Sequence, residues 1–185
     1  MILVRHGESH FNVHFSKTRI DPGIVDPGLT RQGIEQAKSA ATAIGSLNRV
    51  QRIIASPYWR TLQTAEIIAE TLGLPVSIEP LVRERAYFAC DVGSPRHKLS
   101  ARWPNYEFVG LPERWWPNLD ETVEQLGQRS HDFHKQIKDD GNWHDLLVVT
   151  HWGFIRALTG ETVTNGTVLC FDPDSGSVDI HDTQA

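Results

Sequence analysis

The stretch that decides the fold is MILVRHGE, residues 1–8. Its first four side chains are continuously apolar, and Arg5 and His6 end the run. Continuous rather than alternating apolar residues are typical of a strand that is buried on both faces of a parallel sheet. Two later runs, residues 53–55 (IIA) and 146–149 (LLVV), repeat the pattern and also stop at a polar residue. The sequence therefore predicts three buried strands in one sheet.

Helical patterns alternate with these strands. Thr30 is a favourable N-cap for a first helix, a second helix follows Pro57 and ends before Gly73, and Asp120 is the expected N-cap of a third. Each helix has a stripe of residues at helical spacing: Ile34, Ala37, Ala41 and Ile44; then Leu62, Ala65, Ile68, Ala69 and Leu72; then Val123, Leu126, Ser130, Phe133 and Ile137. This alternation predicts an α/β fold, a three-layer α/β/α sandwich with a mostly parallel central sheet.

The other segments lack a clear period. Residues 10–27 include Asp-Pro-Gly turn signals and are predicted to form a loop. Residues 85–119 hold four prolines and three tryptophans, which predicts a loop-rich insertion whose aromatic side chains cover another part of the molecule. Residues 167–171 and 178–181 are expected to pair as a hairpin. Because no repeat or linker interrupts the chain, we expect residues 1–185 to form a single domain.

Composition narrows the classes of function. The 185 residues are 39% hydrophobic and 22% charged, which fits a globular protein with a true core and excludes a disordered chain. A net charge of −5 argues against a nucleic-acid partner held by a basic face. Cys90 and Cys170 are the only cysteines, too few for a disulfide framework, and this favours a reducing compartment. No apolar run is long enough for a signal peptide or a membrane span, so a cytoplasmic location without membrane contact is expected.

Basic side chains follow each of the three predicted strands. Arg5 and His6 follow the first, Arg60 lies one helical turn after the end of the second, and His151 follows the last. Ligands of open parallel sheets bind outside the carboxyl ends of the strands, so these four groups should converge there. Such a cluster needs an anion, and a phosphoryl group offers about two negative charges and several hydrogen-bond acceptors.

Four motifs in this chain resemble the histidine phosphatase superfamily, the phosphoglycerate-mutase-like proteins. They are LVRHGES (3–9), LTRQGIEQA (29–37), SPYWRTLQTA (56–65) and VTHWG (149–153), and three of them stand at the ends of predicted strands. The resemblance covers residues 1 to about 69 and 146 to 156. It implies a phosphoglycerate-mutase-like fold and a phosphate-transferring site that needs neither a metal nor another cofactor.

The resemblance also implies roles for individual residues. His6 matches the nucleophile that becomes phosphorylated, and an imidazole can serve because its ordinary pKa of about 6.5 leaves a neutral fraction at pH 7. Arg5, Arg60 and His151 match the pocket that neutralises the phosphoryl oxygens, so that His151 is both a catalytic and a phosphate-binding residue. Asn12 matches a further phosphate contact, although an asparagine there is equally typical of a turn.

A proton donor is also required, because an alkoxide leaves poorly unless it is protonated as the ester bond breaks. Glu84 resembles the acid of the family, and Asp91 is a second candidate because the segment after Glu84 lacks the Gly-Glu-Gly-like continuation of many mutase relatives. A second departure is Trp152, where many relatives carry a further glycine after the last catalytic histidine. Its indole could form a wall of the pocket or simply pack.

The function expected from these residues is a metal-independent phosphomonoesterase that forms a phosphohistidine at His6 and acts on a small phosphorylated substrate. A phosphoglycerate-mutase-type phosphotransferase is the first alternative, although the family's mutases generally carry a longer insertion than residues 85–119. A metal-dependent hydrolase is the second, suggested by His6, His10 and His14 and by His131 with His134, spacings that suit ligands on a helix. A non-catalytic phospho-ligand binder is the third.

Overall fold

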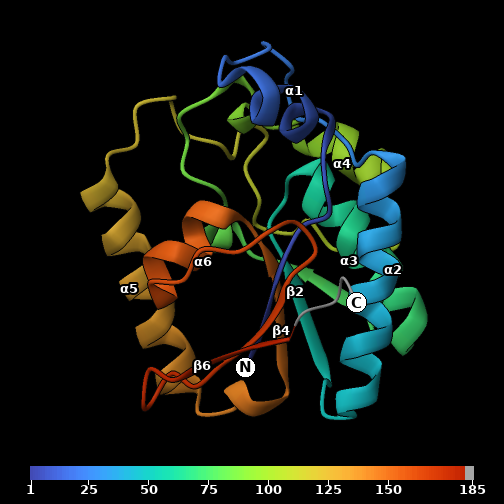
Figure 1. The fold of residues 1–185 in the computed structure, drawn as a ribbon, viewed down its shortest axis with the longest axis vertical. Helices are drawn as coiled ribbons and strands as arrows, with labels where there is room; N and C mark the ends of the chain where they lie inside the picture. Colours follow the sequence, from blue (N-terminus) through green and yellow to red (C-terminus); the bar gives the residue numbers. More distant parts are fainter. Residues whose placement is uncertain (182–185) are drawn as a thin grey trace.

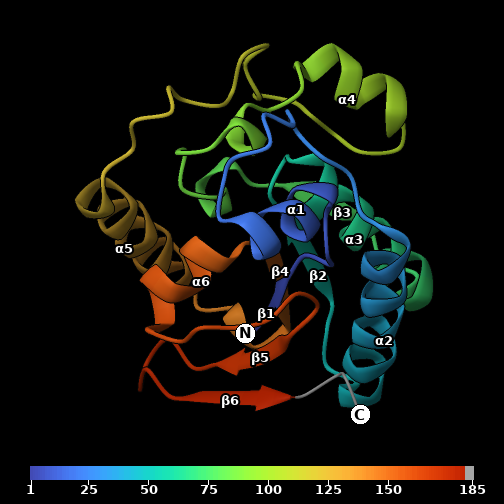
Figure 2. The same ribbon diagram turned by 45° about the horizontal axis from the view of Figure 1, so that its top comes forward.

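The computed structural model describes residues 1–181, and its centre is a six-stranded sheet with the strand order β3-β2-β4-β1-β5-β6 (Figures 1 and 2). Neighbouring strands from β3 to β1 are parallel, and β5 and β6 add an antiparallel edge. The strands are β1 (Ile2–Arg5), β2 (Arg52–Ala55), β3 (Val76–Ile78), β4 (Leu146–Thr150), β5 (Val168–Phe171) and β6 (Val178–His181). The predicted buried strands and the hairpin are confirmed.

Helices cover both faces of the sheet. The helices are α1 (His10–Thr18), α2 (Arg31–Leu47), α3 (Trp59–Leu72), α4 (Arg96–Arg102), α5 (Val123–Asp140) and α6 (Trp152–Thr159). Helices α2 and α3 lie on one side, and α5 and α6 on the other (Figure 1). Successive side chains of β1 point to opposite faces of the sheet. Ile2 and Val4 pack with α2 and α3, and Leu3 packs with α5 and α6. The predicted three-layer α/β/α sandwich is confirmed.

The first two predicted helices are confirmed at their ends as well. The Thr30 side chain accepts a hydrogen bond from the Gly33 amide, which caps α2. Gly73 ends α3 with a φ of 68°, a left-handed conformation that glycine adopts without strain. The predicted cap of α5 is wrong by two residues: Thr122 and not Asp120 caps the helix, since Thr122 and Gln125 exchange the two hydrogen bonds of a capping box.

The prediction of a loop over residues 10–27 is wrong for its first half. Residues 10–18 form α1, which Ser9 begins through a capping box with Asn12. Phe11 is the only buried residue of this helix, so its sequence has no apolar stripe at helical spacing. Its stability comes from the cap and from Phe11 and Phe15, whose ring centroids lie 5.2 Å apart and which both contact Phe88. A search for periodicity misses a helix of this kind.

Residues 85–119 contain α4 and a short 3₁₀ turn at Ala89–Asp91, and otherwise follow an irregular path. As expected, their tryptophans cover another part of the molecule, the start of α3. Trp115 packs edge-on against Tyr58, with the ring centroids 4.7 Å apart, and Trp103 packs against Trp59, with the ring centroids 5.2 Å apart. None of the helices in residues 1–181 has both the length and the apolar character that a membrane crossing requires.

Candidate active site

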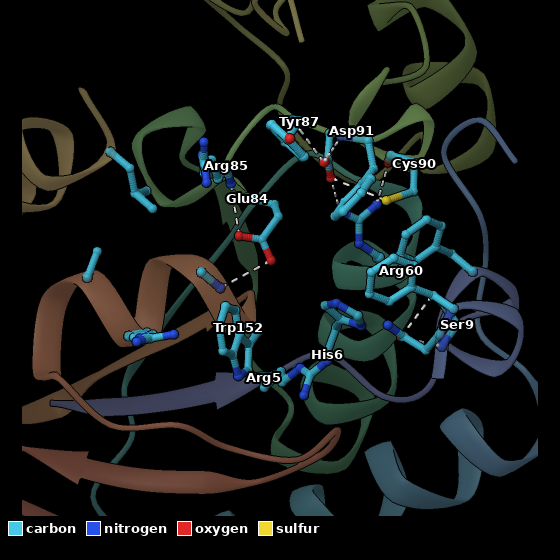
Figure 3. A pocket seen from close by; sticks show the side chains of 18 of the residues that line it. Arg5, His6, Ser9, Arg60, Glu84, Arg85, Tyr87, Cys90, Asp91 and Trp152 are labelled. Carbon is cyan, nitrogen blue, oxygen red and sulfur yellow. Dashed lines mark hydrogen bonds and ion pairs between the residues drawn. The ribbon is translucent and has the colours of Figure 1, made fainter. Parts of the chain in front are cut away.

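A cavity of about 830 Å³ opens at the carboxyl ends of β1, β2 and β4 (Figure 3). Arg5, His6, Arg60 and Glu84 line it, and the His151 ring lies just beneath, with its centroid 5.2 Å from that of His6. The parallel order of the three strands brings the four basic groups together, because β1, β2 and β4 end at the same edge. Arg5 is the last residue of β1, His6 and His151 directly follow β1 and β4, and Arg60 lies in the first turn of α3 after β2. The four basic groups therefore converge as the sequence predicted.

His6 is buried and its tautomer follows from one contact. Its Nδ1 lies 2.7 Å from the carbonyl oxygen of Gly7. A carbonyl can only accept, so Nδ1 carries the proton and Nε2 keeps a free lone pair. Burial, followed by the charges of Arg60 and Arg5, lowers the pKa of His6 well below its ordinary value. The imidazole is therefore neutral at pH 7 and has one nucleophilic nitrogen.

His151 is completely buried behind His6. Its Nε2 lies 2.8 Å from the hydroxyl oxygen of Ser56, while Nδ1 has no hydrogen-bond partner among the described residues. The Tyr58 ring packs edge-on against it at 5.2 Å. Burial, Arg60 and His6 lower the pKa of His151 well below its ordinary value, so this imidazole is also neutral before an anion binds.

Arg60 is the cation most firmly held in the site. Its guanidinium lies 4.4 Å above the Tyr58 ring, donates to the Cys90 carbonyl at 2.8 Å and pairs with Asp91 at 3.1 Å. Asp91 also accepts from the Tyr87 and Phe88 amides. The Asp91 carboxylate therefore fixes Arg60, and this contact makes it a poorer candidate than Glu84 for a proton donor.

Arg5 and Asn12 complete the inner surface. Arg5 donates to the Val163 carbonyl at 2.7 Å, and burial lowers its pKa to about 10, which still leaves it cationic at pH 7. The amide oxygen of Asn12 accepts from the Ser9 amide at 3.0 Å and from Asn165 at 3.2 Å. Because these contacts occupy the oxygen, the amide NH₂ of Asn12 is the part that can reach a bound phosphoryl oxygen.

Glu84 faces Arg60 and His6 across the cavity (Figure 3). Its carboxylate accepts hydrogen bonds from the Arg85 amide at 2.8 Å and from the Gly153 amide at 3.2 Å, at the first turn of α6. A Cβ atom at position 153 would lie 2.2 Å from Glu84 Oε1, so a larger residue there would push the carboxylate out of this position. Burial, followed by the nearby Asp91 carboxylate, raises the pKa of Glu84 and favours its protonated form.

Arg129 of α5 holds the backbone around Glu84. Its guanidinium pairs with Glu121 and donates to three nearby backbone carbonyls, those of Leu81 at 2.7 Å, Arg83 at 2.8 Å and Glu84 at 3.3 Å. Glu121 in turn accepts from the Ala86 amide at 3.0 Å. The segment that carries Glu84 is therefore fixed from both sides by a buried ion pair.

Several supporting residues were missed from the sequence. Ser56 and Tyr58 contact His151, Thr64 accepts from the Gly7 amide at 3.2 Å, and Asn165 donates to the His6 carbonyl at 3.1 Å. Ser56, Tyr58 and Thr64 lie within the motif at residues 56–65, so this motif is the sequence signal that could have identified them as supporting residues. Asn165 lies in a turn before β5, and no sequence pattern marked it.

The histidine spacing that suggested a metal does not form a common site. His10 and His14 are exposed on α1, whereas His6 is buried in the cavity. His134 of α5 instead contacts the Pro173 carbonyl at 2.7 Å. Within residues 1–181, no group of three or more His, Cys, Asp or Glu side chains is placed to hold a metal ion.

A comparison with protein families decides the identity of the fold. The model of the histidine phosphatase superfamily (branch 1) matches residues 1–178. The chain belongs to this superfamily. The resemblance carried by the four sequence motifs is therefore confirmed.

Named relatives of this superfamily member include phosphatases. A metal-independent phosphoserine phosphatase of Arabidopsis thaliana is 30% identical over 85% of this chain, and a glucosyl-3-phosphoglycerate phosphatase of Mycolicibacterium vanbaalenii is 28% identical over 91% of it. A probable phosphoglycerate mutase of an Enterobacter strain is 42% identical over 44% of this chain. The matches span 66%, 78% and 36% of these relatives' own lengths.

Solved structures support the same fold. A mycobacterial glucosyl-3-phosphoglycerate phosphatase in complex with VO₃ aligns with a TM-score of 0.65 at 21% identity, covering 98% of this chain and 95% of that one. At this identity the likeness concerns the fold, which agrees with the predicted phosphoglycerate-mutase-like architecture.

Proposed function

We propose that this superfamily member is a metal-independent phosphomonoesterase that works through a phosphohistidine at His6. The observation that carries the proposal is the hydrogen bond from His6 Nδ1 to the Gly7 carbonyl, because it leaves Nε2 unprotonated beside two arginines. The relatives that are named as phosphatases agree with this assignment. We also propose that the substrate is a small phosphorylated molecule, that one domain in the cytoplasm does this work, and that neither nucleic acid nor a membrane takes part.

In the first step, His6 Nε2 attacks phosphorus while the bond to the ester oxygen breaks. The proton of Glu84 moves to that oxygen, so that a neutral alcohol leaves. Arg5 and Arg60 neutralise the charge that spreads over the equatorial oxygens, and the Asn12 amide donates a hydrogen bond to one of them. In the second step, water attacks phosphorus and gives a proton back to Glu84, the bond between nitrogen and phosphorus breaks, and inorganic phosphate leaves.

His151 contributes through its response to the bound anion. Burial lowers the pKa of His151 in the free site, and the charges of Arg60 and Arg5 lower it further. A phosphoryl dianion offsets these two charges. Binding of the substrate therefore raises that pKa and favours a protonated ring, which donates to a phosphoryl oxygen. This role depends on the burial of His151 behind His6.

The decisive experiment compares His6→Ala with His10→Ala. We expect His6→Ala to lose phosphate release from alkyl phosphates and to lose the acid-labile protein-bound phosphate that wild type shows in a rapid quench. His10 is exposed on α1 and serves as the matched control, which keeps both signals. Undiminished turnover in His6→Ala contradicts the nucleophile assignment, and activity that appears only with a bisphosphate primer favours the mutase alternative.

A further inference from the structure

The cavity is much larger than the phosphoryl group that its inner end would hold. At about 830 Å³ it lies in the range of sites that enclose a whole small molecule. Beyond Glu84 its lining is dominated by apolar and aromatic side chains. We name this part the outer chamber, and it consists of Phe15, Tyr87, Phe88, Val123, Leu126 and Trp152.

Several outer-chamber residues are exposed to an extent that is unusual for large apolar side chains. Tyr87 is 54% exposed, Val123 63% and Trp152 37%. They come from three separate elements, the segment after Glu84, the start of α5 and the start of α6, yet they line the same cavity. Apolar side chains that meet at the mouth of a cavity are typical of a ligand site.

Arginines lie against the two exposed rings. The Arg85 guanidinium lies 4.7 Å from the centre of the Tyr87 ring, and that of Arg156 lies 5.2 Å from the centre of the Trp152 ring. In residues 1–181 neither guanidinium has a carboxylate oxygen within 4.0 Å, and that of Arg85 donates to the Glu121 backbone carbonyl at 2.8 Å. Each contact restricts the motion of a ring, so the chamber offers oriented aromatic surfaces under a cationic rim.

We propose that the outer chamber selects phosphate monoesters whose alcohol carries an aromatic or bulky apolar group over esters of short polar alcohols. The inference rests on the proposed phosphatase function and names its substrate class. The phosphoryl group occupies the inner end beside His6, and the apolar body of the alcohol covers Tyr87, Val123 and Trp152. Acidic side chains do not oppose such a ligand, because Glu84 and Asp91 are the only carboxylates of the described lining and both face the inner end.

The test compares 2-phenylethyl phosphate with ethyl phosphate and O-phosphoserine. The first two are esters of unactivated primary alcohols, so their ratio of kcat/KM reports on the chamber and not on the ease of breaking the bond. We expect wild type to favour the phenylethyl ester by about tenfold or more over both others, the discrimination that an apolar pocket gives. The preference should lie mainly in KM, because the ring binds away from the reacting atoms.

Trp152→Ala and Tyr87→Ala should each reduce the ratio of kcat/KM for 2-phenylethyl phosphate to that for ethyl phosphate. We expect a reduction of several-fold, and about tenfold at most for the loss of one aromatic contact. Both side chains are exposed, so the variants should fold, and Tyr87→Leu provides a second variant that keeps apolar bulk. Val109→Ala is the matched control, since Val109 is 89% exposed and does not line the cavity. Its ratio should equal that of wild type.

Two results would overturn the inference while leaving the proposed phosphatase in place. One is hydrolysis that depends on His6 but whose kcat/KM on ethyl phosphate or O-phosphoserine equals or exceeds that on 2-phenylethyl phosphate. The other is an unchanged ratio in both the Trp152→Ala and Tyr87→Ala variants. A protein that hydrolyses none of the three esters contradicts the phosphatase proposal itself, and the selectivity inference with it.

Discussion

The inner pocket and the outer chamber of the same cavity are built in different ways. Arg5, His6 and Arg60, with His151 beneath them, form the inner pocket. Each lies at or shortly after the end of a buried strand and has at least one polar or aromatic contact that fixes it. The outer chamber comes mostly from irregular segments and helix starts, and half of its side chains are exposed. Under the proposed function, the comparison teaches that the sheet would fix where phosphorus reacts, whereas the loops would determine which alcohol is accepted.

The largest effect should follow a change at the inner pocket. Arg60→Ala removes a buried charge that faces the developing negative charge of the transition state, and we expect kcat/KM to fall on the order of 10²- to 10³-fold for every ester. Steady-state kinetics on the phenylethyl and ethyl esters would show equal losses. Unequal losses would contradict the separation between the two regions.

The control for this change is Arg96→Ala. Arg96 is an exposed arginine that pairs with Glu113 at the surface at 3.8 Å, outside the cavity. Because Arg60→Ala also leaves Asp91 buried without its partner, folding must be checked by circular dichroism before rates are compared. An Arg60→Ala variant with a wild-type circular dichroism spectrum and a wild-type kcat/KM would refute the role of Arg60.

Glu84→Gln should separate esters by the basicity of their leaving groups. We expect on the order of 10²-fold or more loss on ethyl phosphate, whose alkoxide needs a proton, and a much smaller loss on p-nitrophenyl phosphate. The measurement is kcat/KM for both esters in both proteins. Equal losses would exclude Glu84 as the donor, and a selective loss in Asp91→Asn would assign that role to Asp91.

The pH profile gives an independent measure of the same residue. A general acid works while protonated, so activity on ethyl phosphate should decline as pH rises through the pKa of Glu84. Burial and Asp91 raise that pKa, which moves the decline to higher pH than for an ordinary glutamate. Burial, Arg60 and Arg5 lower the pKa of His6, which extends activity to lower pH.

The pH measurement requires kcat/KM from about pH 4 to pH 9, because this constant reports the ionisation of the free enzyme. Glu84→Gln should lose the decline at high pH and keep the one at low pH. If the high-pH decline persists in the variant, another group is responsible for it.

Gly153→Ala tests how closely Glu84 approaches α6. The added Cβ would lie 2.2 Å from Glu84 Oε1, so the carboxylate must move. We expect roughly tenfold loss on ethyl phosphate and little loss on p-nitrophenyl phosphate, because misplacement of a donor costs less than its removal. Gly45→Ala in α2 is the control, since its nearest contact would be 3.7 Å and a helical alanine is favourable.

The sequence predicted the inner pocket because its signals are local. A continuous apolar run predicts a buried strand, parallel strands share an edge, and His6 and His151 follow such strands directly. The supporting contacts were less accessible. Asp91 is far from Arg60 along the chain, and only the irregular path after Glu84 places its carboxylate 3.1 Å from the guanidinium.

The sequence offered Trp152 as a possible wall of the pocket, and Trp152 does line the cavity. The rest of the outer chamber could not be predicted, for a related physical reason. Only Val123 and Leu126 belong to a predicted helical stripe, and Val123 departs from it because its side chain is 63% exposed. Phe15 lies on α1, a helix held by the Ser9 capping box and not by an apolar stripe. Tyr87 and Trp152 are oriented by arginines that face them in space, at 4.7 and 5.2 Å. Side-chain contacts between irregular segments depend on the whole fold, so no local sequence pattern predicts them.

The smallest expected effect concerns the helix that brings Val123 and Leu126 to the outer chamber. Thr122 caps α5 by accepting from the Gln125 amide at 3.2 Å, whereas no cap contact involves Asp120. We expect Thr122→Ala to lower the free energy of unfolding by about 1 kcal/mol and Asp120→Ala to change it by less than about 0.5 kcal/mol. Urea denaturation of the two variants measures the difference.

The same pair of variants also compares the two regions directly. A frayed α5 start displaces Val123 but no inner-pocket residue, so Thr122→Ala should weaken the preference for the phenylethyl ester and leave inhibition by inorganic phosphate as in wild type. Inorganic phosphate is the right ligand for this purpose because it has no alcohol to contact the chamber. Weaker phosphate inhibition in Thr122→Ala would show that the start of α5 also supports the inner pocket, and the division between reacting centre and selective loops would then be wrong.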